Sequence, residues 1–255
     1  MGGITPEALL PALVLVLAGT FEILAPWRTL RGPTGRRWTS NLGLFGLCFG
    51  LGYLMAPFVA AGVAAIGPPS GPFAHVSTPL LRLAVAIVVL DLLDYAMHRA
   101  SHRFALLWRV HQPHHSDLEL DCTTALRHHP FEAALTSVVI GGGGALLGIA
   151  PREIAIYGAL ALAVQLVAHA NLSLPPRLAR LLAPILVTPD FHRLHHSQMR
   201  SQADANYGQL FSFWDRLFAS RQQGQISAIA FGVEGCHEAE AWNLHRLLAR
   251  PLLRR

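Results

Sequence analysis

The sequence has little charge for its length, and this shortage argues against an ordinary soluble domain. Only 14% of the 255 residues are charged, whereas 52% are hydrophobic, and the mean hydropathy is +0.38. Lysine is absent, so the 20 basic residues set against 15 acidic ones are all arginines. These arginines are scattered between apolar segments, which favours a membrane surface over a nucleic acid as the partner. We therefore expect an integral membrane protein that binds no nucleic acid.

Cysteine is also scarce, and several common motifs are missing. The three cysteines, Cys48, Cys122 and Cys236, are odd in number and lack CxxC spacing, so neither a disulfide framework nor a thiolate metal site is indicated. The sequence contains no HExxH, which argues against a zinc hydrolase. It also contains no GxGxxG nucleotide loop and no heme-binding HPGG stretch. We expect that any redox reaction here would draw its electrons from a separate protein.

Apolar stretches predict the membrane helices. The first, Ala8 to Trp27, has about the ~20 residues needed to cross hydrocarbon. We interpret it as a membrane helix rather than a signal peptide because no basic residue precedes it. The other stretches are Leu42 to Ile66, Leu80 to Ala96, Ala133 to Ala150 and Ile154 to Ala168, with Pro151 to Glu153 separating the last two. The pattern predicts an all-α integral membrane protein with about four to five membrane helices, arranged as two helical hairpins plus a central helix.

The loops between these stretches predict the orientation. Arg28, Arg31, Arg36 and Arg37 lie between the first two stretches, whereas the next loop carries no charged residue. The positive-inside rule places the first loop in the cytoplasm, so the histidine-rich region forms a cytosolic helical cap. We expect one domain over 1–255, in a bacterial inner membrane. Its parts are N-terminal membrane helices (1–79), a catalytic region (80–220) and a C-terminal tail (221–255).

Eight of the 14 histidines fall into three spaced groups. These are His98 and His102, then His111, His114 and His115, then His192, His195 and His196. Residues three and four apart are neighbours on a helix, so each group can present its rings together. Pro113 predicts that the second group begins a helix. A single zinc site takes about four ligands, so eight imidazoles suit two metal ions. Imidazole also binds iron, copper and nickel, and ligand type alone does not select the metal.

Other polar residues near these groups are candidates for ligation or support. His169 ends the last apolar stretch, one turn after Gln165, and is the ninth candidate ligand. Asp94 lies one turn before the first histidine group, where its carboxylate either accepts a hydrogen bond from a ligand ring or faces lipid headgroups. His128 and His129 are adjacent, so at most one of them is expected to face the site. Three histidines have no partner at ligand spacing and are expected to be structural: His75, His237 and His245.

At these residues the sequence resembles the fatty acid hydroxylase and sterol desaturase superfamily, whose histidine boxes read HxxxH, HxxHH and HxxHH. The likeness runs from about Leu80 to Ser220. Some members carry a further box before the last, and Gln165 stands where its first histidine would be. The flanking matches are Asp94-Tyr95, Ala125-Leu126-Arg127, His129-Pro130 with Glu132, His169-Ala170-Asn171, Asn206-Tyr207-Gly208 and Trp214 to Phe218. We take Asp94, His129, Gln165 and Asn171 as candidates to support the ligands.

The resemblance implies a function and its cofactors. Members use two non-heme iron ions and O2 to hydroxylate or desaturate a lipid such as a fatty acyl chain or a sterol-like molecule. The same likeness implies a lipid substrate from the bilayer and a separate ferredoxin or cytochrome as electron donor. The alternative is a membrane metal-binding or metal-transport protein, which would place its ligands within several membrane helices rather than at helix ends. A bis-histidine heme protein would leave six of the eight box histidines unused.

Overall fold

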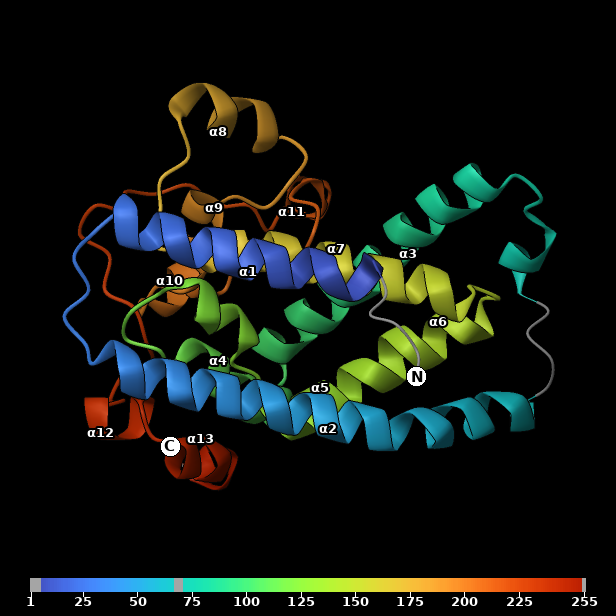
Figure 1. Cartoon of the computed structure of the whole chain (residues 1–255), viewed down its shortest axis with the longest axis horizontal. Helices are drawn as coiled ribbons and strands as arrows, with labels where there is room; N and C mark the ends of the chain where they lie inside the picture. The colour runs from blue at the N-terminus through green and yellow to red at the C-terminus, as the bar shows by residue number, and fades with distance from the viewer. Residues whose placement is uncertain (1–5, 67–70, 254–255) are drawn as a thin grey trace.

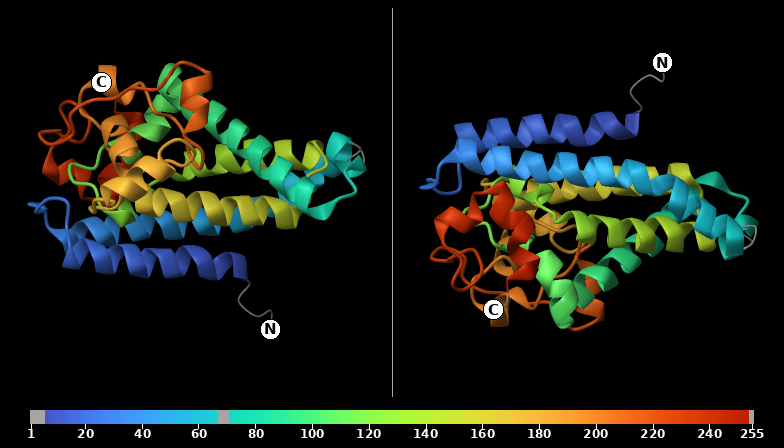
Figure 2. Two further views of the ribbon diagram at one scale, coloured as in Figure 1. Left: turned by 90° about the horizontal axis from the view of Figure 1, so that it is seen from above. Right: turned by 90° about the horizontal axis from the view of Figure 1, so that it is seen from below.

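The computed structural model describes residues 6–66 and 71–253, and over these ranges the chain is helical, with no strand. Long helices form an elongated bundle, and the short helices that follow residue 170 gather toward one end of it (Figures 1 and 2). We call this end the cap. The elements are α1 (Pro6–Leu24), α2 (Thr34–Ile66), η1 (Pro72–His75), α3 (Pro79–Arg103), α4 (Ala105–His115), η2 (Cys122–Leu126), α5 (Pro130–Thr136), η3 (Ser137–Gly142), α6 (Gly143–Leu146), α7 (Pro151–His169), α8 (Pro176–Leu182), α9 (Pro189–His195), α10 (Arg200–Ala203), α11 (Phe213–Leu217), α12 (Glu238–Ala241), α13 (Leu244–Ala249) and η4 (Arg250–Leu252).

The long helices extend beyond the apolar stretches that predicted them. Helix α2 begins well before Leu42, and α3 continues to Arg103, so the first histidine group lies on the same helix as the third apolar stretch. The break predicted at Pro151 is a helix start. Proline is favoured there because it lacks an N–H that would need a partner. The Glu153 carboxylate caps the helix by accepting a hydrogen bond from the Ala150 amide at 2.8 Å.

The fourth apolar stretch does not form one regular helix. It consists of α5, the π-helical turn η3 and α6. The π turn includes the first two residues of the glycine run that begins at Gly141, and glycine is a poor helix former because of its backbone freedom. A turn at Gly148, with φ of 83°, then leads into α7. The predicted hairpin with α7 is therefore present, with an irregular first arm (Figure 1).

Two of the described helices, α2 and α7, are long and apolar enough to cross a membrane. This is fewer than the four to five predicted. The apolar segments Leu9–Leu24 and Pro130–Leu146 are shorter, and α3 carries Arg82, Asp91 and Asp94 within its apolar stretch. The outer surface of α2 exposes large apolar side chains, among them Phe49 and Phe58 at 70% each. Such a surface is typical of a membrane protein.

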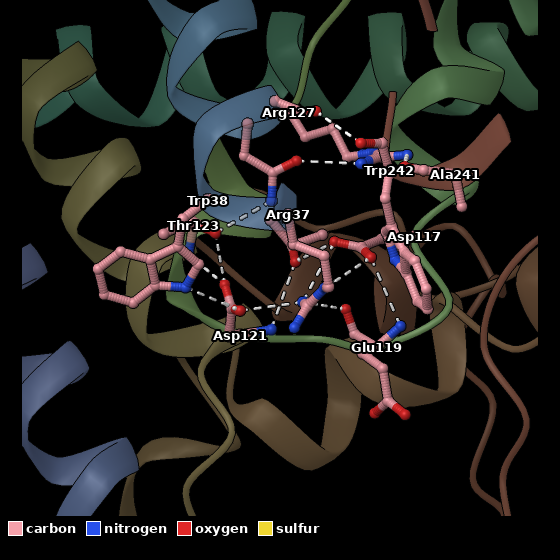
Figure 3. A network of polar contacts seen from close by, with 12 residues as sticks. Arg37, Trp38, Asp117, Glu119, Asp121, Thr123, Arg127, Ala241 and Trp242 are labelled. Carbon is pink, nitrogen blue, oxygen red and sulfur yellow. Dashed lines mark hydrogen bonds and ion pairs between the residues drawn. The ribbon is translucent and has the colours of Figure 1, made fainter. Parts of the chain in front are cut away.

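A buried polar network joins the start of α2 to the cap (Figure 3). The Arg37 guanidinium is fully buried and forms ion pairs with Asp117 at 3.2 Å and Asp121 at 2.9 Å. Arg127 is equally buried and donates hydrogen bonds to the Asn41 side chain and to a backbone carbonyl of α12. The first loop and the cap therefore lie at the same end of the bundle. Arg37, which counted toward the predicted orientation, is an internal charge and not a surface one.

Candidate metal centre

All nine candidate ligand histidines are buried, and the structure brings them together where α3, α4, α7 and α9 meet. Their ring nitrogens form two groups, each with atoms within 4.8 Å of one another. The five-histidine set contains His98, His102, His111, His115 and His195. The four-histidine set contains His114, His169, His192 and His196. Two adjoining sites are therefore available for metal ions.

The two HxxHH groups are each divided between the sets. On α4, His111 and His115 belong to the five-histidine set, whereas His114 belongs to the other. At the end of α9 the division is reversed, because only His195 faces the five-histidine set. Adjacent residues on a helix point about 100° apart, since one turn takes 3.6 residues. One turn of helix thus supplies ligands to both sites.

Backbone carbonyls orient several of the rings. Each carbonyl can only accept a hydrogen bond, so the Nδ1 atom facing it carries the proton and Nε2 keeps a lone pair. This arrangement aims Nε2 into the site, as in proteins that bind a metal through histidine. The pairs are His98 with the Tyr207 carbonyl (2.8 Å), His114 with Arg127 (3.2 Å), His169 with Gln165 (2.8 Å) and His195 with Ala205 (2.7 Å).

The Nε2 atoms that face one another within the histidine sets are placed to bind metal ions. The Nε2 atoms of His114 and His169 lie 3.2 Å apart, and two lone pairs at that distance repel unless a cation lies beside both. The Nε2 atoms of His98, His102 and His195 are buried without a hydrogen-bond partner. Burial holds the pKa of His114 well below its ordinary value and lowers the pKa of His195 to about 3, so protons do not supply this cation at neutral pH. Neutral imidazoles in such groups are suited to bind metal.

A carboxylate that the sequence analysis gave no role lies against the five-histidine set. Oε1 of Glu132 is 2.6 Å from Nδ1 of His111, and Oε2 is 3.2 Å from Nδ1 of His128. The His128 ring stacks on His114, with ring centroids 4.6 Å apart. Glu132 stands in the flanking pattern that resembles the family, so a signal for it was present. Only the packing of α5 against α4 shows which ring it contacts.

Two of the proposed supporting residues hold other parts of the fold instead. The Asp94 carboxylate accepts a hydrogen bond from the Tyr157 hydroxyl at 2.8 Å rather than from a ligand ring. His129 accepts a hydrogen bond from the Phe131 amide at the start of α5, and its Nε2 lies 3.2 Å from the Leu248 carbonyl of the C-terminal tail. The histidine of this adjacent pair that reaches the site is His128.

The remaining predicted residues differ in their roles. Asn171 exchanges hydrogen bonds with the backbone of Arg28 and so ties the first loop to the end of α7. The Gln165 amide donates to the Gln209 carbonyl, and only its backbone orients His169. Pro113 lies in the last turn of α4, not at a helix start, because the helix has already formed over the residues before it. Among the described residues, five histidines lie outside both sets: His128 and His129, described above, and the three that were expected to be structural, His75, His237 and His245.

An apolar cavity of about 710 Å³ reaches the centre from the side of the long helices. It lies among α2, α3, α5, η3 and α7 and touches His98 and His111 at one end. A second cavity, of about 920 Å³ and more polar, reaches His115 from the cap side. Trp108 lines this second cavity, and its ring centroid lies 5.1 Å from that of His102 and 5.3 Å from that of His115. Cavities thus reach the centre both from the long helices and from the cap.

Comparison with known proteins identifies the family. The family profile described as Fatty acid hydroxylase matches residues 83–220, which is more than half of the chain and includes all nine histidines and Glu132. The chain belongs to the fatty acid hydroxylase family. The match ends near the end of the histidine-rich region, so the N-terminal helices and the C-terminal tail lie outside it.

The relatives that this fatty acid hydroxylase family member matches have names that describe reactions of lipids. Ornithine lipid hydroxylase OlsE of Rhizobium tropici is 29% identical over 140 residues, which cover 54% of this chain and 41% of the relative. Human alkylglycerol monooxygenase is 32% identical over 137 residues, which cover 53% of this chain and 29% of the relative. Very-long-chain aldehyde decarbonylase GL1-9 of Oryza sativa subsp. indica is 31% identical over 142 residues, covering 54% of each. The chain thus spans about half or less of the relatives it matches. No solved structure matches it.

Proposed function

We propose that this member of the fatty acid hydroxylase family is an O2-dependent di-iron oxidase that hydroxylates or desaturates a C–H bond of a membrane lipid. The observation that carries the proposal is the pair of buried, adjoining histidine sets, of which the five-histidine set lies directly against an apolar cavity through His98 and His111. A lipid C–H bond has no polar handle for acid–base chemistry, so a redox metal beside an apolar cavity suits it. The names of the relatives agree with a lipid substrate.

Each histidine set would hold one iron ion. Iron bound there would supply the activation of O2 that organic side chains cannot provide. The residues of this chain contribute the geometry: backbone carbonyls fix the orientation of His98, His114, His169 and His195, and Glu132 fixes His111. In hydroxylation one oxygen atom of O2 enters the C–H bond, and the other leaves as water after taking up two electrons and two protons. In desaturation two hydrogens leave the substrate, and together with two electrons and two protons from outside they convert both oxygen atoms of O2 to water.

The electrons require a separate donor, for which we propose a ferredoxin or a cytochrome. The cap-side cavity offers an approach for this donor, because His115 lines it and Trp108 lines it beside the rings of His102 and His115. The Arg200 guanidinium carbon lies 5.7 Å from the Trp108 ring and is exposed beside it. A positive group at this place would attract an acidic donor protein.

We also propose the placement in the membrane. Helices α1, α2, α3 and α7, with the irregular α5–η3–α6 segment as a further span, would give four to five spans. The first loop and the cap would face the cytoplasm of a bacterial cell, with the chain in the inner membrane. Arg31 and Arg36 support this orientation because both are exposed in or next to the first loop.

The alternative is a membrane metal-binding or metal-transport protein. A transporter needs ligands along a path through the bundle, whereas the histidine sets here lie together at the cap end. The deciding experiment is iron quantitation with an optical spectrum of the purified protein, together with mass spectrometry of lipids from cells with and without the gene. Two non-heme irons per chain and a lipid that gains one oxygen, or loses two hydrogens, support the oxidase. Zinc, a Soret band or unchanged lipids in cells that hold a suitable electron donor would refute it.

A further inference from the structure

The cavity among the long helices has one polar end, and the rest of its lining is mainly apolar, although the hydroxyl residues Thr136 and Ser137 also line it. Asp94, His128 and Gln165 lie at the end that touches the five-histidine set through His98 and His111. Beyond Tyr157, whose hydroxyl turns back to hydrogen-bond Asp94, the walls are apolar side chains and glycines. The distant part is lined by Ala56, Val59, Ala60, Val63, Ile140, Gly141, Ala145, Pro151, Ile154, Gly158, Ala161 and Leu162. A ligand that matches this lining has one polar end and a long apolar body.

The lining residues also give the cavity its length. On α7 they run from Gln165 at the histidine end to Pro151, which corresponds to about 21 Å at 1.5 Å per residue. On α2 they run from Phe45 to Val63, and the part from Cys48, whose Sγ lies 3.2 Å from the His128 carbonyl, to Val63 corresponds to about 22 Å. A cavity of about 710 Å³ drawn out over this length is narrow. Its shape suits one extended hydrocarbon chain better than a fused ring system.

Two glycines leave open space beside the helices that line the cavity. Gly52 on α2 and Gly158 on α7 both line the cavity, and a Cβ atom added at either would meet no atom within 4 Å. Glycine inside a helix costs roughly 1 kcal/mol relative to alanine, so its presence there calls for a reason. Open space at these positions keeps the cavity wide enough for methylene groups.

We propose that this cavity binds a single acyl chain with its polar end among Asp94, His128 and Gln165 and its tail toward Val63. The oxidised carbon is then one of those near the polar end of the chain and not one near the methyl end. Gly52 and Gly158 determine the longest chain that fits. This inference rests on the proposed oxidase function for its reaction, but the binding geometry does not depend on it.

The test replaces each glycine by leucine in the full-length protein. Leucine is a better helix former than glycine, so both helices should form. Gly52 is one turn from Cys48, about 6 Å along α2, and Gly158 is about 10 Å from Gln165 along α7. Gly52→Leu should therefore restrict the chain to shorter lengths than Gly158→Leu does. The matched control is Gly50→Leu, because Gly50 has equally open space on the same helix but does not line the cavity.

Two measurements read the result. Native mass spectrometry of the purified proteins with a homologous series of saturated fatty acids gives the preferred chain length without any turnover. Tandem mass spectrometry of cellular lipids gives the position of the new oxygen or double bond. In a tight apolar pocket, one methylene group changes the preference between two ligands by roughly tenfold or more. The ratio of bound long chains to bound short chains should therefore fall by about tenfold in each cavity variant. Gly50→Leu should match the wild type.

The outcomes separate the two proposals. Unchanged length preference in both cavity variants, or oxidation at the methyl end of the chain, overturns this inference even if the wild type oxidises lipids. Length-selective binding with no oxidised lipid supports the acyl-chain site and counts against the oxidase function. Equal shifts in Gly50→Leu and Gly52→Leu would trace the effect to α2 as a whole and overturn the assignment of Gly52.

Discussion

The Nδ1 atom of His111 lies 2.6 Å from Oε1 of Glu132, which comes from a different helix and from outside every histidine group. A carboxylate that accepts a hydrogen bond from a ligand histidine fixes the tautomer and the direction of the ring and raises its basicity. The same carboxylate lies 3.2 Å from His128, so one side chain holds two imidazoles at the border between the metal centre and the acyl-chain cavity.

Glu132→Ala should weaken metal binding by about 10- to 100-fold, the usual effect of losing such a partner. Glu132→Gln should weaken it less, because the amide oxygen can still accept from His111. Competition with a chelator of known affinity measures the change. Glu153→Ala serves as control, since this carboxylate pairs with Arg82 at the far end of α7. Unaltered metal affinity in Glu132→Ala would show that His111 needs no such support.

His114 and His115 are adjacent in the sequence but belong to different sets, so their substitutions should differ. His114→Ala leaves three rings in the four-histidine set, and we expect the loss of about one metal ion per chain. His115→Ala leaves four rings in the other set, and we expect both ions to be retained. Metal analysis after gel filtration gives the count, with the exposed His245→Ala as control. Equal losses in the two variants would contradict the division into two sets.

The buried Arg37 should matter for folding, whereas its exposed neighbour Arg36 should not. Arg37→Leu leaves Asp117 and Asp121 buried without their shared cation, and breaking a buried ion pair in this way costs about 3–5 kcal/mol. Arg36→Leu removes the same charge from the surface and should cost little. Thermal unfolding in detergent compares the two variants. A similar melting temperature for both would mean that the network in Figure 3 adds little to stability.

Trp108 should affect the delivery of electrons more than the binding of metal. Its ring lines the cap-side cavity and contacts two rings of the five-histidine set, those of His102 and His115. We expect Trp108→Leu to keep its metal and to be reduced normally by dithionite, but to be reduced more slowly by ferredoxin. Trp108→Phe should be intermediate because it keeps an aromatic ring. Stopped-flow absorbance measures both rates, and equal slowing by the two reductants would indicate a distorted centre instead.

The metal-free protein should lose stability as the pH falls below about 6.5. Burial lowers the pKa of His192 and His196 well below this ordinary value and lowers that of His195 to about 3. Between the lowered and the ordinary pKa the unfolded chain binds more protons than the folded one, so acid favours unfolding. Each histidine contributes at most about 1.4 kcal/mol per pH unit. Melting temperatures across this range measure the slope, which His196→Ala should reduce and His245→Ala should not.

The candidate ligands were accessible from the sequence because their signals are local. Spacings of three and four residues put imidazoles on one face of a helix, and a count of eight or nine exceeds what one ion needs. Hydropathy located the long helices, and the spacing of His98 and His102 placed the first histidine group on a helix, which is the end of α3. Hydropathy missed the π turn that interrupts the fourth apolar stretch.

By itself, the sequence determined the kind of ligand, its helical spacing, the apolar character of the long helices and the likeness to the family. The tertiary structure alone decided how nine rings divide into sets of five and four, and that Glu132 rather than Asp94 contacts a ligand. It also decided that Arg37 is an internal charge and that Gly52 and Gly158 face one cavity. These relationships depend on the angles at which helices distant in the sequence pack, and the local spacing of residues carries no information about those angles.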